Sequence, residues 1–569
     1  MIVTRLLITL LGIAMLSLPH SAAGYDRGGK HPNQSRSVVI AKHGMVATSH
    51  PLAAQVGLDI LKAGGNAADA AIAVNAMLGV VEPMSCGIGG DVFVIYWDAK
   101  TQKLYGLNGS GRSPYAINRQ VFKDKGLTQI PLEGPLPWSV PGCVHGWGEL
   151  RGRFGKLPLA QILQPAIETA EEGCPVPEVI AGYWKGAEKK LQQWPDSAAT
   201  FLIDGQRAPR EGELMKNPRL AATMRLIGEQ GPEAFYKGKI AQTIVAFSGK
   251  NGGYFSLQDF ADHTSEWIEP VSTNYRGYDV WELPPNGQGI AALEMLNILE
   301  QWDIASLGHS SAEHIHLFIE AKKLAFADRA KFYADQAFEK LPVAELISKE
   351  YGKRQAKRID MNHAAEEVPA GDAKLALGDT VYLTVVDKDR NCCSFIQSNF
   401  HGFGSMVVPG DVGFAMQNRG QLFALDDTHL NRLEPHKPPF HTIIPAFITK
   451  NGKPHFCFGV MGGDMQPQGH VQIVMNLIDF GMNVQAAGDA PRVMHTGSAT
   501  PTGLAAEGTG TVSVEAGVSD DVVEALKAKG HKVVRARGYG GYQGILIDWE
   551  RGILHGGTEA RKDGAAVGY

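Results

Sequence analysis

The sequence predicts an α+β fold, in which helices and strands occupy different stretches of the chain. Helical patterns broken by Gly and Pro fill residues 159–360, and short strands separated by turn residues follow over residues 377–458. Helical patterns return near His470 and Asp520. With 44% hydrophobic and 20% charged residues, the 569-residue chain has the composition of a globular protein and the length for one large core built from two halves.

The N-terminus has the pattern of an export signal. One basic residue, Arg5, precedes an apolar run over residues 6–18, and small residues follow up to Ala23. Because this run is too short to span a bilayer, we expect a signal peptide of residues 1–23, with an uncleaved anchor as the alternative. No later stretch is apolar enough for a membrane span, so we expect an exported, periplasmic or secreted protein. The net charge of -5 gives no reason to expect nucleic acid as a partner.

Two helices and a strand are predicted early in the chain. The first helix runs from about Pro51 to Ala63 and is closed by Gly64-Gly65, and the second, rich in Ala, runs from about Ala67 to Leu78. The segment CGIGGDVFVIYWD then has glycines before a strand. A dinucleotide-binding loop has the opposite order, so this segment is not expected to bind phosphate.

Neither the histidines nor the cysteines have the spacing of a metal site. Residues 310–335 form a long amphipathic helical pattern, on which His314 and His316 are two positions apart and so point away from each other. The six cysteines include no CxxC pair, and the neighbours Cys392 and Cys393 lie on a predicted strand that turns them to opposite faces. We expect small buried thiols, leave one disulfide open, and expect no metal and no cofactor.

A hairpin is predicted around the segment GDTVYLTVVD. The run from Val381 to Val386 is almost entirely β-branched or aromatic, residues 387–391 are typical of a turn, and residues 392–397 form a returning strand. Thr380 therefore lies at the open end of the hairpin. Because the chain has no GxSxG, HExxH or GxxxxGK[ST] segment, the common serine hydrolases, zincins and P-loop NTPases are disfavoured.

Thr380 is a candidate nucleophile only if a base lies beside it. The α-amino group of the threonine itself, with a pKa near 8, would serve once the Asp379–Thr380 bond is cut. On its own, a threonine after a Gly-Asp turn is more simply explained as the start of a strand. Further along, Gly462-Gly463 follows a strand and could direct two backbone N–H groups at an oxyanion, and Ser398 lies on the strand paired with Thr380.

Many separate blocks of the chain resemble one known family. The segments GDTVYLTVVDKDRN, GFGSMVVPGDVGFAMQNRG, PFHTIIPAF, GVMGGDMQPQGHVQIVMNLIDFGMN and KDGAAVGY are similar to the small subunit of γ-glutamyltransferases, the glutathione hydrolases. The segments GMVATSHPLAAQVGLDILKAGGNAADAAIAV and EPMSCGIGGDVFVIYWD are similar to the large subunit. The resemblance implies an N-terminal nucleophile hydrolase with a four-layer αββα sandwich. It further implies a proenzyme cut into a large subunit (residues 24–379) and a small subunit (residues 380–569) that remain associated.

The resemblance also implies roles for single residues. Thr380 would be both the self-cleavage residue, together with Asp379, and the catalytic nucleophile. Ser398 occupies the place of a family threonine that hydrogen-bonds the nucleophile. Gly462 and Gly463 match the oxyanion-hole glycines, and Asn418 matches an asparagine of the substrate pocket.

The residues that would bind the γ-glutamyl head depart from the family pattern. Ser110 stands where glutathione-using members have an arginine, with Arg112 two residues later, and Phe400 replaces an asparagine, with Asn399 beside it. The other replacements, of a glutamine, an aspartate and a Ser-Ser pair, are Arg419, Leu422, and His441-Thr442. Losing a carboxylate partner should weaken binding of an ammonium group. Arg112 and Arg419 could instead bracket an anionic acyl group, the alternative for each being a structural salt bridge.

We therefore expect an exported γ-glutamyltransferase-like amidase that acts on a small-molecule amide or a peptide. One alternative is a glutaryl- or cephalosporin-type acylase, or a small-amide (oxamate-like) amidohydrolase, of the same fold. A more remote alternative is an unprocessed binding protein. The Gly-Asp-Thr segment, the paired glycines and Ser398 argue against the binding protein.

Overall fold

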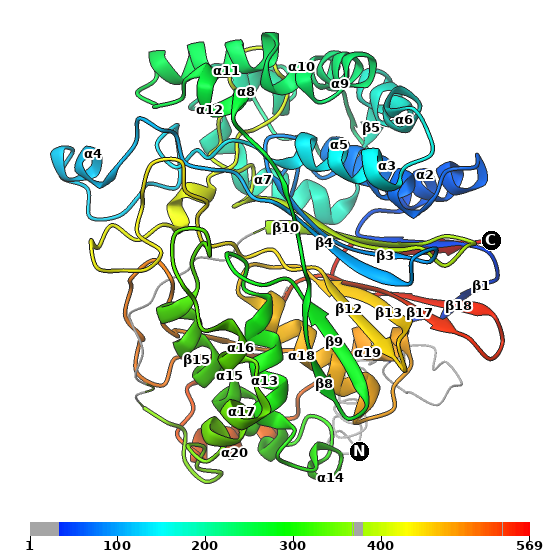
Figure 1. The fold of residues 1–569 in the computed structure, drawn as a ribbon, viewed down its shortest axis with the longest axis vertical. Coiled ribbons are helices and arrows are strands. Elements are labelled where there is room, and N and C mark those ends of the chain that lie inside the picture. Colours follow the sequence, from blue (N-terminus) through cyan, green and yellow to red (C-terminus); the bar gives the residue numbers. More distant parts are fainter. Residues whose placement is uncertain (1–33, 367, 369–378, 538) are drawn as a thin grey trace, which may run out of the picture.

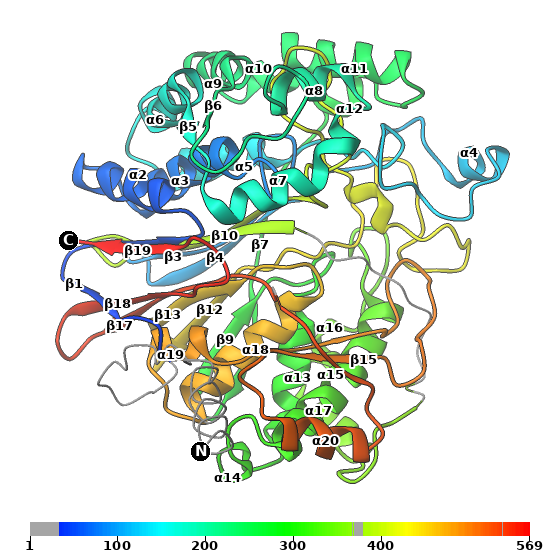
Figure 2. The same ribbon diagram turned by 180° about the vertical axis from the view of Figure 1, so that it is seen from behind.

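Two seven-stranded antiparallel sheets lie face to face at the centre of the molecule, and helices cover both outer faces (Figures 1 and 2). This computed structural model describes residues 34–366, 368, 379–537 and 539–569. The predicted signal peptide lies outside the described residues. No helix in these ranges combines the length and the hydropathy needed to cross a membrane. The four layers confirm the expected αββα sandwich.

The sheet that contains Thr380, here called the β10 sheet, combines strands from distant parts of the chain. Its order is β19 (Ala565–Gly568), β2 (Met45–Thr48), β10 (Asp379–Val386), β11 (Cys392–Phe400), β3 (Asp91–Asp98), β4 (Lys103–Gly109) and β7 (Glu266–Ile268). The facing β13 sheet has the order β1 (Val39–Ala41), β18 (Ile553–Thr558), β17 (Tyr542–Asp548), β13 (Lys453–Val460), β12 (Ala446–Lys450), β9 (Tyr278–Glu282) and β8 (Val271–Tyr275).

Both sheets combine strands from before and after Thr380. In the β10 sheet, β2 lies between β19 and β10, and β3 pairs with β11. In the β13 sheet, β1 pairs with β18 and β9 pairs with β12. A cut before Thr380 would therefore leave these ladders intact, and each sheet would hold the two chains together.

The helices form one outer layer on each sheet. The outer face of the β10 sheet is covered by α2 (Pro51–Lys62), α3 (Ala67–Val81), α5 (Cys143–Phe154) and α6 (Leu159–Glu172), with α7 (Glu178–Leu191) to α12 (Leu257–Ala261) beyond them. The β13 sheet is covered by α13 (Gly289–Leu299), α15 (Ala312–Phe332), α18 (Met465–Ile478) and α19 (Val484–Asp489), with α20 (Asp520–Ala528) outside. A small sheet of β14 (Val493–Thr496), β15 (Thr511–Val514) and β16 (Val533–Arg535) lies beside them.

The alternation of side chains along β11 fixes which residues face which layer. Cys393 and Phe395 pack against the helices, whereas Cys392 and Ile396 pack between the two sheets. All six cysteines are buried and none is in a disulfide, so the expectation of small buried thiols is confirmed and the disulfide left open in the sequence is not formed. Ser398, on the same face as Ile396, therefore points into the space between the sheets.

The predicted elements near the N-terminus are confirmed with small shifts. Helix α2 ends at Lys62, and α3 begins at Ala67, where Asn66 and Asp69 form a capping box, and extends three residues beyond the predicted end. The glycines of CGIGG do precede a strand, β3. The helical patterns predicted near His470 and Asp520 are α18 and α20.

Two predictions from the pattern were wrong. The helix over residues 310–335 is not amphipathic, because 18 of the 21 residues of α15 are buried, packed against α13, α20 and β14 of the small sheet. Buried charged side chains on it have partners inside the protein, as Lys323 has in Glu320. The stretch between β11 and β12 contains no strand of either sheet and only the short helix η1 (Arg419–Leu422), because most of its backbone bonds to other loops.

Gly459 shows how closely the two sheets approach. A Cβ atom at this position of β13 would lie 2.5 Å from the ring of Tyr382 on the facing β10. We predict that Gly459→Ala lowers the free energy of unfolding by about 1–3 kcal/mol, the usual cost of an overpacked core. The measurement is the midpoint of thermal unfolding.

Gly152→Ala is the matched control for Gly459→Ala. An added Cβ meets open space at this position of α5, and alanine is the better helix former, so the midpoint should stay unchanged or rise. Equal midpoints for the two variants would mean that the sheets separate to admit a methyl group.

Candidate active site

The Thr380 hydroxyl lies at the end of β10 and bonds Ser398 on the neighbouring strand. Thr380 Oγ1 donates to Ser398 Oγ at 3.3 Å. Ser398 Oγ also accepts the backbone N–H of Phe400, at 2.8 Å. Both hydroxyl side chains are buried. The register between β10 and β11 shifts between Asp379 and Val381, so the pairing is irregular at Thr380 itself. The prediction that Thr380 lies at the open end of a hairpin, with Ser398 on the paired strand, is confirmed.

Gly462 and Gly463 form a tight loop between β13 and α18. Their φ angles are 113° and 56°, values that L-residues with a side chain rarely adopt. A Cβ on Gly462 would also lie 3.1 Å from Gly540 Cα. Among the described residues, neither glycine N–H donates to a protein acceptor. Such N–H groups are available to a ligand oxygen.

Arg419 is a fully buried cation that uses only part of its donor set. Its Nη1 donates to Thr442 Oγ1 at 2.7 Å, and its guanidinium lies 4.6 Å from the centre of the Phe400 ring. Its Nε and Nη2 have no partner among the described residues. Burial lowers the pKa of Arg419 to about 9, and Asp91 opposes that shift, so the guanidinium is charged at neutral pH.

Asp91 is engaged by donors other than Arg419. One carboxylate oxygen accepts from Gly142 N at 3.1 Å and Gln417 Nε2 at 2.8 Å, and the other lies 3.0 Å from His441 Nε2. His441 Nδ1 accepts the backbone N–H of Ile443, so the ring proton is on Nε2, which faces Asp91. Burial, and then Arg419, lower the pKa of His441 to about 4, so His441 is neutral. Arg419 is left without a carboxylate bound to it.

Arg112 has a different environment from Arg419. Its Nη2 donates to Glu266 at 2.6 Å and its Nη1 to His436 O at 3.4 Å. Ser110, two residues earlier, accepts from Asn286 Nδ2 at 3.0 Å. The structure therefore brings Arg419 and Thr442 together and places Arg112 in an ion pair.

Two further candidates, Asn418 and Asn399, bond backbone groups of other residues through their side chains. Asn418 donates through its side chain to Leu132 O at 2.9 Å and accepts from His401 N at 3.2 Å. Asn399 donates to Cys86 O at 3.2 Å, and its Oδ1 has no partner among the described residues. Leu422 packs into the apolar cluster around α13 and α15, so no polar group stands at its position.

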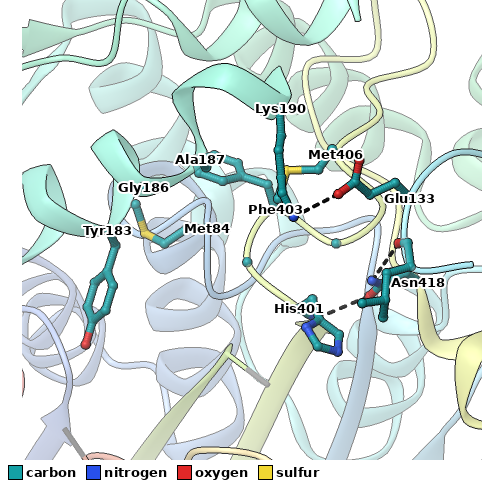
Figure 3. Close-up of a pocket in the computed structure, with 13 residues that line it drawn as sticks. Met84, Glu133, Tyr183, Gly186, Ala187, Lys190, His401, Phe403, Met406 and Asn418 are labelled. Atoms are coloured by element: carbon teal, nitrogen blue, oxygen red, sulfur yellow. Dashed lines mark hydrogen bonds and ion pairs between the residues drawn. The ribbon is translucent and has the colours of Figure 1, made fainter. Parts of the chain in front are cut away.

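A cavity of about 240 Å³ lies beside this region (Figure 3). Figure 3 shows His401 and Asn418 on one side of it and Tyr183 on the other. Its wall is mostly apolar, with one ion pair of 2.8 Å between Lys190 and Glu133. The lining residues come from both sides of the predicted cleavage point: Met84, Leu132, Glu133, Tyr183, Gly186, Ala187, Lys190, His401, Gly402, Phe403, Gly404, Met406 and Asn418.

Two site residues were missed in the sequence. Gln288 donates to the carbonyl oxygens of Thr442 and Gly463, and Arg329 donates to the side chains of Gln288 and Asp464. Gln288 lies in a Pro-Pro-Asn-Gly-Gln segment that predicts only a break between elements, and Arg329 lies in the supposed amphipathic helix. A glutamine beside glycines is the one signal that could have indicated a polar role.

A single group of metal-ligand residues, His316, Glu320 and His531, occurs among the described residues. His316 Nδ1 and His531 Nε2 are 2.8 Å apart, and Glu320 forms a 2.6 Å ion pair with Lys323. His531 Nδ1 has no hydrogen-bond partner among the described residues, and none of the three residues contacts the site around Thr380. His314 is not part of the group, in agreement with the spacing argument.

Comparisons with known proteins agree on one family. The model of the gamma-glutamyltranspeptidase family matches residues 53–569. The chain is 41% identical to the glutathione hydrolase-like YwrD proenzyme of Bacillus subtilis, over 94% of this chain and all of the relative. It is 33% identical to the oxamate amidohydrolase proenzyme of Klebsiella pneumoniae, over 93% and 99% of the two chains. The crystal structure of a cephalosporin acylase from Bacillus halodurans superposes with a TM-score of 0.88 at 45% identity, over 97% and 99%.

The contact between Thr380 and Ser398 can be tested directly. We predict that Ser398→Ala lowers kcat by about 10- to 100-fold, because the nucleophile loses its bonded hydroxyl, and that Ser398→Thr retains most activity. Ser394→Ala is the matched control, since Ser394 is on the same strand and face and bonds the Tyr382 hydroxyl at 2.7 Å. An equal loss in the Ser394 and Ser398 alanine variants would show that the hydroxyl acts only on stability.

Proposed function

The chain belongs to the gamma-glutamyltranspeptidase family, and we propose that it is a self-processing amidase with an N-terminal threonine nucleophile. It would hydrolyse or transfer γ-glutamyl or related acyl groups from amides such as glutathione. The observation that supports this proposal is the Thr380 hydroxyl bonded to Ser398 at 3.3 Å at the end of β10. In the intact chain the Thr380 nitrogen is a peptide nitrogen and cannot act as a base, so processing must come first.

The proposed reaction has two halves. After the Asp379–Thr380 bond is cut, the Thr380 amine takes the hydroxyl proton while Oγ1 attacks the substrate carbonyl carbon. The amides of Gly462 and Gly463 would stabilise the oxyanion, and the amine leaving group would take the proton as the C–N bond breaks. Water or an acceptor amine then attacks the acyl-threonine ester and regenerates Thr380.

The proposed enzyme would be processed twice and exported. Residues 1–23 would be removed on export, and the large subunit (24–379) and small subunit (380–569) would remain associated through the ladders of both sheets. The enzyme would then be periplasmic or secreted and would need no cofactor.

A second candidate function differs in the acyl group and is favoured by Arg419. The free Nε and Nη2 of this buried guanidinium fit a substrate carboxylate, whereas Leu422 gives a substrate ammonium no partner. A dicarboxylic monoamide, such as a glutaryl amide or the smaller oxamate, provides the carboxylate and lacks the ammonium. Asn399, Asn418, His441 and Thr442 would shape this pocket, and Arg112 would act at its edge, beside Glu266.

Self-cleavage is the first test of the proposal. Purified protein should run as two chains, and N-terminal sequencing of the smaller chain should begin at Thr380. Thr380→Ala should remain one chain, because it lacks the attacking hydroxyl, and Thr384→Ala, on the same strand, should be cut normally. A wild-type protein without a new terminus at Thr380 would contradict the mechanism and favour the binding-protein alternative.

Substrate choice is the second test. We predict that kcat/KM for a glutaryl anilide equals or exceeds that for the γ-glutamyl anilide, because the two differ only by the ammonium. Arg419→Gln should lower the glutaryl value more than Arg112→Gln does, since Glu266 already neutralises Arg112. A γ-glutamyl preference of tenfold or more, about 1.4 kcal/mol in transition-state binding, would rule out the anionic acyl group and leave the glutathione hydrolase activity.

A further inference from the structure

The side chain of Gln288 bonds two separate parts of the candidate site at once. It lies at the N-terminal cap of α13 and is fully buried. Its Nε2 donates to the carbonyl oxygen of Thr442 at 2.6 Å and to that of Gly463 at 2.9 Å. These two bonds use both protons of the amide, so the group has no other donor to offer.

Arg329 fixes the orientation of this amide. Its Nη1 donates to Gln288 Oε1 at 2.6 Å and to Asp464 Oδ1 at 2.6 Å, and its Nη2 donates to Asp464 Oδ2 at 3.2 Å. The guanidinium is fully buried and lies 3.7 Å from the centre of the Phe326 ring. Because a guanidinium only donates, Oε1 must face Arg329 and Nε2 must face the two carbonyls.

Each carbonyl belongs to a residue with a function in the proposed site. Thr442 provides the hydroxyl that accepts from Arg419, and Gly463 belongs to the oxyanion loop. Asp464, the residue after Gly463, is held by Arg329 as well. One buried amide on α13 therefore links Thr442, the partner of Arg419, to the oxyanion loop.

We propose that Gln288 is a positioning residue that matches the acyl-chain length of the substrate to the distance between Arg419 and the oxyanion glycines. The inference rests on the proposed function and specifies the substrate class of the same site, namely acyl groups of one length that end in an anion. An acyl group that is too short or too long would reach Arg419 only by moving its carbonyl away from the glycine amides. Gln288 and Arg329 precede the cleavage point whereas Thr442 and Gly463 follow it, so each subunit would position the other.

The test compares Gln288→Ala with a matched control, Gln472→Ala. Gln472 is also buried and also donates to two carbonyls, those of Gln468 at 3.1 Å and Val493 at 2.9 Å, but it contacts no residue of the site. The substrates are succinyl, glutaryl, adipyl and γ-glutamyl anilides, and the measurements are kcat and KM for each, with self-cleavage and the thermal midpoint as checks of folding.

The wild-type enzyme should prefer one length among the three ω-carboxyacyl anilides by tenfold or more. Gln288→Ala should lower kcat for that anilide by tenfold or more and reduce the length preference to less than threefold. Gln288→Glu should behave in the same way, because an ionised carboxylate cannot donate to the carbonyls. Gln472→Ala should keep the wild-type kcat and length preference, even if its thermal midpoint falls as far.

Other outcomes separate this inference from the proposed function. An unchanged length preference in a processed Gln288→Ala enzyme, or an equal change in Gln472→Ala, would overturn the role of Gln288. A wild type that turns over only the γ-glutamyl anilide would refute the anionic acyl class and the length matching with it. An enzyme that remains uncut and inactive on all four anilides would refute the proposed function itself.

Discussion

The apolar layer between the two sheets determines the geometry of the whole site. Thr380 and Ser398 lie at the ends of strands in one sheet, and the Gly462-Gly463 loop follows a strand of the other. No disulfide fixes the distance between these groups, because none of the six cysteines is in one. The distance depends on how far the sheets can approach, and Tyr382 packed on Gly459 shows that they are in close contact.

The buried arginines differ in whether a carboxylate is bound to them. Arg329 is paired with Asp464, and Arg492, equally buried, is paired with Glu559 at 2.8 Å. Arg419 has a hydroxyl and an aromatic ring as its neighbours but no bound carboxylate. Burying an unpaired cation costs several kcal/mol, which a substrate carboxylate would offset on binding. If the proposed anionic acyl group binds here, Arg419 would be placed for it before it arrives, at some cost in stability.

Local sequence patterns predict the helices and strands, but they do not predict contacts between residues far apart in the chain. The hairpin of β10 and β11, the position of Thr380, the free thiols and the helices α2 and α3 all follow from periodicity and turn residues within short windows. The partner of Arg112 is Glu266, 154 residues away, and that of Gln288 is Gly463, 175 residues away. The amphipathic pattern of α15 is wrong for a related reason: a pattern treats charged residues as exposed, whereas most of those on α15 are buried and find partners inside the protein.

Each sheet contains strands from before and after Thr380, which explains how a threonine in the middle of a chain could become a terminus without disturbing its surroundings. β10 is held by β2 on one side and β11 on the other, and both ladders continue beyond Thr380 toward Val386. The uncut chain already presents the hydroxyl to Ser398, so cleavage would supply only the amine. The protein must therefore fold before self-cleavage can produce an active enzyme. A variant that weakens the packing between the sheets should stop cleaving itself before it loses secondary structure.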